Sequence, residues 1–159
     1  MKTKFLTLLM FCFFANIITA QKVIKPADLK VANLATFLKS KGYNILEQEE
    51  TYLKISDSGN NHIFIDKDPG NKFLHLNVKI LLLDKAKKPQ ITALLEKING
   101  LDMISARYIE SDNSVFFQYF FWTTNGFTYE TLEDAVMEFI LYQGDSYALD
   151  EEKIFDYAD

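Results

Sequence analysis

The stretch from Val115 to Thr123, VFFQYFFWT, places six aromatic residues in nine positions. A β-strand alternates its side chains between two faces, so these aromatic rings cannot all point into one core. The odd-numbered positions share one face and the even-numbered positions the other, and both faces carry large apolar side chains. Such a strand belongs either to a sheet that is covered on both sides or to one that presents apolar surface to a partner.

The first 20 residues are expected to be a signal peptide rather than part of the fold. Lys2 and Lys4 precede an apolar run over residues 5–14, and short side chains lead up to Ala20. This layout is typical of a secretory signal that is cleaved between Ala20 and Gln21. The apolar run is shorter than the ~20 residues of a spanning helix, which disfavours a stable membrane anchor. We therefore expect an exported protein, either periplasmic or extracellular.

Cys12 is the only cysteine of the chain and lies inside the apolar run of the signal. Phe11 precedes it where a lipidation signal would have a small residue, so we interpret Cys12 as part of the signal core. The mature chain then has no cysteine. An exported domain without disulfides must be stabilised by its hydrophobic core, and residues 21–159 suffice for one domain of ordinary size.

The mature chain carries an excess of acidic residues. The full sequence has 17 basic and 22 acidic residues, and cleavage removes Lys2 and Lys4 but no acidic residue, which leaves 15 against 22 and a formal charge of −7. This charge disfavours nucleic acid and anionic lipid as partners, because both bind clustered lysine and arginine. Residues 144–159 form an acidic tail, expected either to pack a few aromatics on the domain edge or to bind a partner.

Hydrophobic periodicity and turn residues predict an α+β domain over residues 21–143. Helical spacing and strand-like alternation follow one another in the order helix, four strands, helix, two strands, helix. The predicted segments are residues 26–42, 44–50, 51–56, 62–66, 73–83, 87–100, 103–110, 115–123 and 128–143. Because the helices are segregated from the strands, we expect an antiparallel sheet with its helices packed on one face.

The strand over residues 73–80 indicates which face of the sheet is the core. Its even-numbered positions are all aliphatic, whereas its odd-numbered positions are mixed and are expected to face outward. Large aromatics on the outward side are the predicted partner-binding residues, and they would meet a second copy of the chain or another envelope protein. The alternative is that the first helix, the tail or the strand over residues 44–50 covers them as ordinary core. The residues concerned are Phe73, Phe116, Phe120 and Trp122.

The stretch from Leu34 to Tyr142 resembles the YbjN family, labelled bacterial sensory transduction regulators. The likeness lies in FLKSKGYNI, INGLD, ARYIESDNSVFF and GFTYETLEDAVMEFI. The resemblance implies a fold similar to that of type III secretion chaperones and a protein-binding or regulatory role, with no family-wide catalytic residues. An exported member cannot act as a cytoplasmic secretion chaperone, so the chaperone likeness applies to shape alone.

A metal site would have to use the two histidines, His62 and His75. If their strands pair so that His62 faces Asn77 and His75 faces Phe64, the histidines become diagonal neighbours about 7–8 Å apart on the outward face, which Asp66 shares. Structural metal sites generally need four ligands, and no ligand spacing supports one here, so we predict solvated histidines and no metal or cofactor.

Signals of enzymatic chemistry are missing from the mature sequence, and we predict no catalytic residue. The sequence has no Gly-x-Ser-x-Gly motif and no glycine-rich phosphate loop, and its paired carboxylates lie at turns. Arg107 could hold a carboxylate ligand, although a cross-strand salt bridge or an aromatic stack is the ordinary role at such a position. The prediction is a non-enzymatic binding module. The alternative is a small-molecule or metal-binding sensor or enzyme that uses His62, His75 and Arg107.

Overall fold

The computed structural model describes residues 22–156. The expected signal peptide, its cleavage point after Ala20 and the last three residues of the chain lie outside the described residues.

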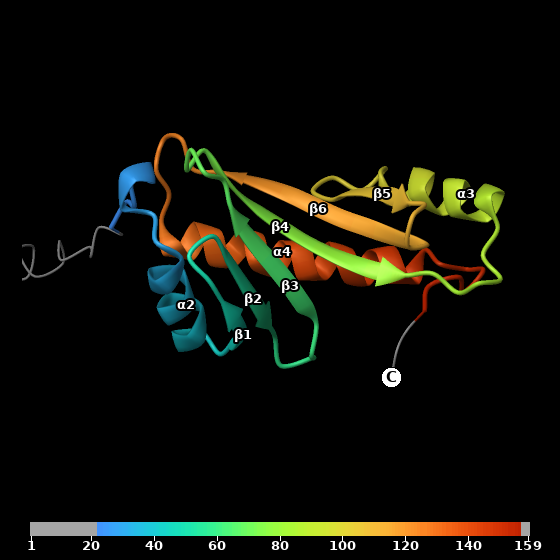
Figure 1. Cartoon of the computed structure of the whole chain (residues 1–159), viewed down its shortest axis with the longest axis horizontal. Coiled ribbons are helices and arrows are strands. Elements are labelled where there is room, and N and C mark those ends of the chain that lie inside the picture. The colour runs from blue at the N-terminus through green and yellow to red at the C-terminus, as the bar shows by residue number, and fades with distance from the viewer. Residues whose placement is uncertain (1–21, 157–159) are drawn as a thin grey trace, which may run out of the picture.

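Six strands and three α-helices make up the described chain (Figure 1). The 3-10 helix η1 and the helix α2 come first, four strands follow, and α3 separates them from the last two strands and α4. In chain order the elements are η1 (Pro26–Asp28), α2 (Val31–Ser40), β1 (Asn44–Gln48), β2 (Tyr52–Ser56), β3 (His62–Lys67), β4 (Phe73–Leu81), α3 (Lys88–Ile98), β5 (Ser105–Ile109), β6 (Ser114–Trp122) and α4 (Tyr129–Ala148).

All six strands belong to one antiparallel sheet with the order β1-β2-β3-β4-β6-β5. The predicted α+β class with an antiparallel sheet is confirmed. The longest pairing joins β4 to β6 from Phe73–Trp122 to Leu81–Ser114, so the aromatic strand is flanked by β4 over its whole length. By contrast, β3 and β4 pair over only four residues each, Phe64–Lys67 with Leu74–Asn77.

One hydrophobic core lies between the helices and the face of the sheet that we call the inner face. Period-two alternation puts every second side chain of each strand on this face, and the helices contribute stripes at helical spacing. The strands supply Leu53, Ile55, Ile63, Ile65, Leu74, Leu76, Val115 and Phe117 to the core, and the helices supply Leu34, Leu38, Ile91, Leu94, Ile98, Leu132, Val136 and Phe139.

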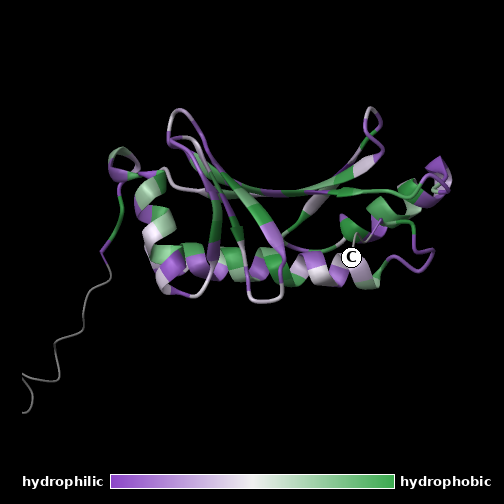
Figure 2. Cartoon of the chain, turned by 60° about the horizontal axis from the view of Figure 1, so that its bottom comes forward, coloured by the Kyte–Doolittle hydropathy of each residue, from purple (hydrophilic) through white to green (hydrophobic). Residues whose placement is uncertain are grey.

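The opposite face of the sheet, called here the outer face, carries no helix in the described residues. Figure 2 shows α4 running along one side of the curved sheet while the other side is open. The outer-face side chains of β4 and β6 are half-buried or exposed, apart from the buried Asn77 and Ser114.

Three of the four hairpin turns, those after β2, β3 and β5, form where turn residues predict them, and each contains an asparagine in a left-handed conformation. The positive φ angles are 63° at Asn60, 54° at Asn71 and 50° at Asn113. In the turn between β3 and β4, the Asp68 carboxylate accepts the Lys72 N–H at 3.1 Å, and the Asp68 N–H donates to the Phe73 carbonyl at 3.2 Å. This closure sets Asp66 opposite His75 and Phe64 opposite Asn77. The predicted register, with His62 opposite Asn77, is therefore wrong by two residues.

The segment over residues 149–156, after α4, folds back onto the core. Helix α4 continues through Gly144 to Ala148, so the boundary predicted at residue 144 falls inside a helix. Beyond it, Ile154 and Phe155 are buried, and the Leu83 N–H donates to the Ile154 carbonyl at 2.8 Å. The acidic side chains of this segment thus surround apolar residues that complete the core.

Among the described residues, the helices are too short or too polar to cross a membrane.

Candidate functional site

Six side chains from three neighbouring strands form a continuous row on the outer face. Cross-strand pairing places Phe73 of β4 opposite Trp122 of β6, and His75 opposite Phe120. Phe73 contacts both aromatic neighbours edge to face, with ring centroids 5.2 Å from Phe120 and 5.6 Å from Trp122. We call the following set the aromatic row: Trp122, Phe73, Phe120, His75, Phe116 and Arg107.

The aromatic row is not part of the core. Trp122 is 66% exposed and Phe120 is 38% exposed, and Phe73 and Phe116 are half-buried. None of these four rings packs against the core cluster. The elements proposed as covers lie elsewhere, because β1 pairs with β2 at the far edge of the sheet and α2 and Phe155 belong to the inner-face core. The alternative that these aromatics are ordinary core is therefore excluded within residues 22–156.

Arg107 ends the row on β5. Its guanidinium carbon lies 5.0 Å from the centroid of the Phe116 ring, which is the cross-strand neighbour of Arg107. Of the two ordinary roles expected at this position, a cross-strand salt bridge or an aromatic stack, the structure shows the stack. No carboxylate of the described residues lies within 4.0 Å of the guanidinium, and Arg107 is the only arginine of the chain. Its charge is therefore available to a partner.

His75 is held in the middle of the row by its ring contacts. The imidazole stacks on Phe120 with centroids 4.6 Å apart and planes 8° from parallel. His75 Nδ1 lies 3.7 Å from Asp66 Oδ2, the same oxygen that accepts a 2.7 Å hydrogen bond from the Asn77 amide. His75 Nε2 is buried without a hydrogen-bond partner in the described chain. These contacts make His75 a component of an aromatic surface.

His62 does not join the row. It begins β3, beyond the stretch that pairs with β4, and lies four positions before Asp66, the residue opposite His75. Four strand residues span about 13 Å, so the two histidines are too far apart to bind one metal ion. The predicted proximity of His62 and His75 is corrected by the observed register. Residues 22–156 contain no group of three or more His, Asp or Glu side chains that could hold a metal ion.

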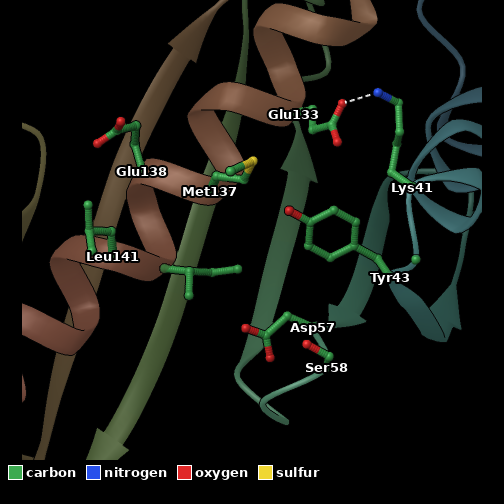
Figure 3. A pocket seen from close by; sticks show the side chains of 10 residues that line it. Lys41, Tyr43, Asp57, Ser58, Glu133, Met137, Glu138 and Leu141 are labelled. Carbon is green, nitrogen blue, oxygen red and sulfur yellow. Dashed lines mark ion pairs between the residues drawn. The ribbon is translucent and has the colours of Figure 1, made fainter.

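A second surface, which the sequence reasoning missed, is an open groove of about 610 Å³ beside α4 (Figure 3). Met137 and Leu141, one helical turn apart and both more than half exposed, form its apolar side. The ion pair between Lys41 and Glu133 closes one end. The sequence signal that could have indicated this groove is the Met137–Leu141 pair, which lies outside the buried stripe of α4.

Tyr43 projects into this groove, and Figure 3 shows its hydroxyl directed toward α4. Burial raises the pKa of the Tyr43 phenol, and the nearby carboxylates of Glu133 and Asp57 raise it further. The hydroxyl therefore stays protonated around neutral pH. The groove combines apolar walls with acidic groups, of which Glu133 pairs with Lys41 and Asp57 accepts hydrogen bonds from Asn61.

The two surfaces differ in what they can do chemically. The aromatic row offers flat apolar rings held in place by mutual contacts, together with one cation that has no carboxylate partner. Such a surface binds by apolar contact and stacking.

The sequence matches no protein-family model and no curated protein.

Proposed function

We propose that the mature chain is an exported, non-enzymatic protein-binding or regulatory module that self-associates through its outer sheet face. The observation that carries the proposal is the exposure of Trp122 and Phe120 in an ordered aromatic row that no element of residues 22–156 covers.

The chemistry of the row suits protein recognition. Tryptophan, other aromatics and arginine are enriched among the residues that contribute most to protein interfaces. Here the rings of Phe73, Phe120 and Trp122 already contact one another, so little side-chain entropy is lost when a partner covers them. Arg107, stacked on Phe116, adds a site for a carboxylate at the end of the row.

The resemblance of residues 34–142 to the YbjN family supports a regulatory or binding role. A chaperone-like shape is part of the same proposal, and the helices packed against one face of an antiparallel sheet are consistent with it. Export to a periplasm or to the outside of the cell rests on the signal-like first 20 residues.

The test is the solution mass of residues 21–159, measured by light scattering over a range of concentrations. We expect a dimer at high concentration. Replacing two exposed rings, Trp122→Glu and Phe120→Lys, is expected to shift the mass to that of a monomer while the circular dichroism spectrum is unchanged.

Leu141→Glu is the matched control, because Leu141 is 57% exposed but lies on α4, away from the aromatic row. This variant is expected to dimerise like the unmodified chain. A chain that stays monomeric at all concentrations would contradict self-association, and equal dissociation by all three substitutions would contradict the assignment to the outer face.

A further inference from the structure

One stretch of β6 has a strand on only one side. The pairing between β5 and β6 runs from Ile109–Ser114 to Ser105–Gln118 and stops there, whereas β4 flanks β6 as far as Trp122. Figure 1 shows β5 beside only part of β6. We call residues 119–122 the free stretch of β6.

The main-chain groups that this stretch leaves unpaired can be identified. The Ser105 hydroxyl donates to the Gln118 carbonyl at 3.5 Å, so the main-chain carbonyl of Gln118 points toward β5. The Thr123 N–H donates to the Lys72 carbonyl at 2.9 Å, on the β4 side. Because successive residues of a strand direct their N–H and C=O groups to opposite sides, Phe120 and Trp122 direct theirs away from β4. No described residue pairs with them there.

The two outermost strands of this sheet, β1 and β5, are protected at their edges. A bulge between Ile45 and Glu47 interrupts the edge at β1. On β5, the Asn99 side chain accepts the Ala106 N–H at 2.7 Å and donates to the Ala106 carbonyl at 3.0 Å. Bulges and blocking groups are the usual means of preventing edge-to-edge association. The free stretch has neither, and it carries aromatic side chains instead of charges.

The free stretch has a fixed beginning and a fixed end, which limits how it can pair with the same segment of a second copy. It begins where Ser105 stops pairing with Gln118, and the chain turns after Thr123, whose carbonyl accepts the Gly126 N–H at 2.9 Å. An antiparallel, two-fold pairing that sets Phe121 opposite its own copy forms two hydrogen-bonded pairs, each between Phe120 of one copy and Trp122 of the other.

The two neighbouring registers are disfavoured. Setting Phe120 opposite its own copy would require Gln118 to pair with Trp122 of the second copy, and Ser105 already occupies that side of Gln118. Setting Trp122 opposite its own copy would pair Phe120 with Thr124, which belongs to the turn. Only the register centred on Phe121 uses all four unpaired groups.

We infer that the mature chain dimerises by pairing the free stretch of β6 with the same stretch of a second copy, which joins two sheets into one. This inference rests on the proposed self-association but places the contact at the edge of the sheet, so that the two outer faces become continuous and do not cover each other. In that arrangement each Trp122 ring becomes the cross-strand neighbour of Phe120 of the second copy, so two aromatic rows merge across the two-fold axis. Cross-strand aromatic pairs stabilise such a sheet beyond their main-chain hydrogen bonds.

The absence of cysteine from residues 21–159 allows a direct test by disulfide trapping. Phe121 lies at a non-hydrogen-bonded position of the inferred pair, where opposed Cα atoms are about 4.5 Å apart and a disulfide can form. Under mild oxidation, we expect Phe121→Cys to convert almost completely to a covalent dimer. Met137→Cys, at a site 56% exposed on α4, is the control and is expected to remain mainly monomeric on a non-reducing gel.

A second pair of variants covers the case that Phe121→Cys fails to fold, because Phe121 packs edge to face on Phe127. Phe120→Cys and Trp122→Cys are expected to form a disulfide when the two proteins are mixed, and neither is expected to do so alone. A folded protein that forms no disulfide in either design would overturn the inferred pairing.

Light scattering distinguishes failure of the inferred edge pairing from failure of the proposed self-association. A non-covalent dimer that Trp122→Glu dissociates, combined with failure of both disulfide designs, would overturn edge pairing but leave the outer-face association standing. A monomer throughout would overturn both.

Discussion

Asp150 illustrates how a single carboxylate organises the end of the chain. It is only 6% exposed and accepts hydrogen bonds from the main-chain N–H groups of Ile154, at 3.0 Å, and Phe155, at 2.9 Å. These bonds hold the two buried apolar residues in place, and Phe155 in turn forms a bridge to Leu82. The negative charge at position 150 is therefore structural, although in the sequence it looks like the other acids of the segment.

Asp150→Ala is expected to lower the free energy of unfolding by about 2–4 kcal/mol, because it removes the acceptor of two buried main-chain N–H groups. Asp150→Asn keeps one carbonyl oxygen and should cost less. The measurement is urea unfolding followed by circular dichroism. Asp156→Ala is the control: its side chain is exposed and its N–H still reaches the Leu81 carbonyl, so we expect a change within about 0.5 kcal/mol. Equal effects at both positions would contradict the role given to Asp150.

At the scale of elements, the segment before α2 is attached to the segment after β6. Ile24 and Phe127 form an isolated bridge, with the Ile24 N–H donating to the Phe127 carbonyl at 2.7 Å and the reverse bond at 3.1 Å. Gly126 makes this approach possible. It has φ +82°, and a Cβ there would lie 2.8 Å from Val23 Cγ1 and 3.1 Å from the Ile24 carbonyl oxygen.

Two glycine substitutions should therefore have opposite effects. Gly126→Ala is expected to lower the free energy of unfolding by about 1–3 kcal/mol, because alanine is strained at positive φ and its Cβ would contact a fixed carbonyl. Gly144→Ala lies within α4 with open space around the added Cβ, and it should raise stability by up to about 1 kcal/mol. Thermal unfolding of both variants is the measurement, and a change of the same sign in both would contradict this account.

At the scale of the whole molecule, the two faces of the sheet have different roles. The inner face and all three α-helices share one core cluster, whereas the aromatic row on the outer face lies outside that cluster. A single core of this kind is expected to unfold as one cooperative unit. Substitutions on the inner face should therefore change the stability of the folded chain itself, and substitutions on the outer face should change stability only through association.

Urea unfolding of residues 21–159 should give one transition, with its midpoint rising as the protein concentration is raised, because a partner that binds only the folded state stabilises it. The Trp122→Glu variant should show a midpoint that does not depend on concentration. Circular dichroism measures the midpoints of both proteins, because its signal does not depend on the Trp122 indole that the variant lacks. Two separate transitions would contradict the single core, and a concentration-independent midpoint in the unmodified chain would contradict the dimer.

Local periodicity determined much of this molecule. Alternation along residues 73–80 and 115–123 is enough to predict that Phe73, Phe116, Phe120 and Trp122 share one face, and turn residues locate three of the four hairpin turns. These properties depend on the strand repeat and on the φ preferences of glycine and asparagine, so they can be read from neighbouring residues alone.

Tertiary structure decided what lies beside each strand and what covers each face. The turn closed by Asp68 separated His62 from His75, because a two-residue shift of register preserves the face but moves the partner. Tertiary structure also decided that the aromatic row stays uncovered, that β5 ends opposite Gln118 and that Ile154 and Phe155 are buried. Each depends on packing between segments distant in the sequence, and hydrophobic burial is non-directional, so periodicity along one segment does not specify which other segment will cover it.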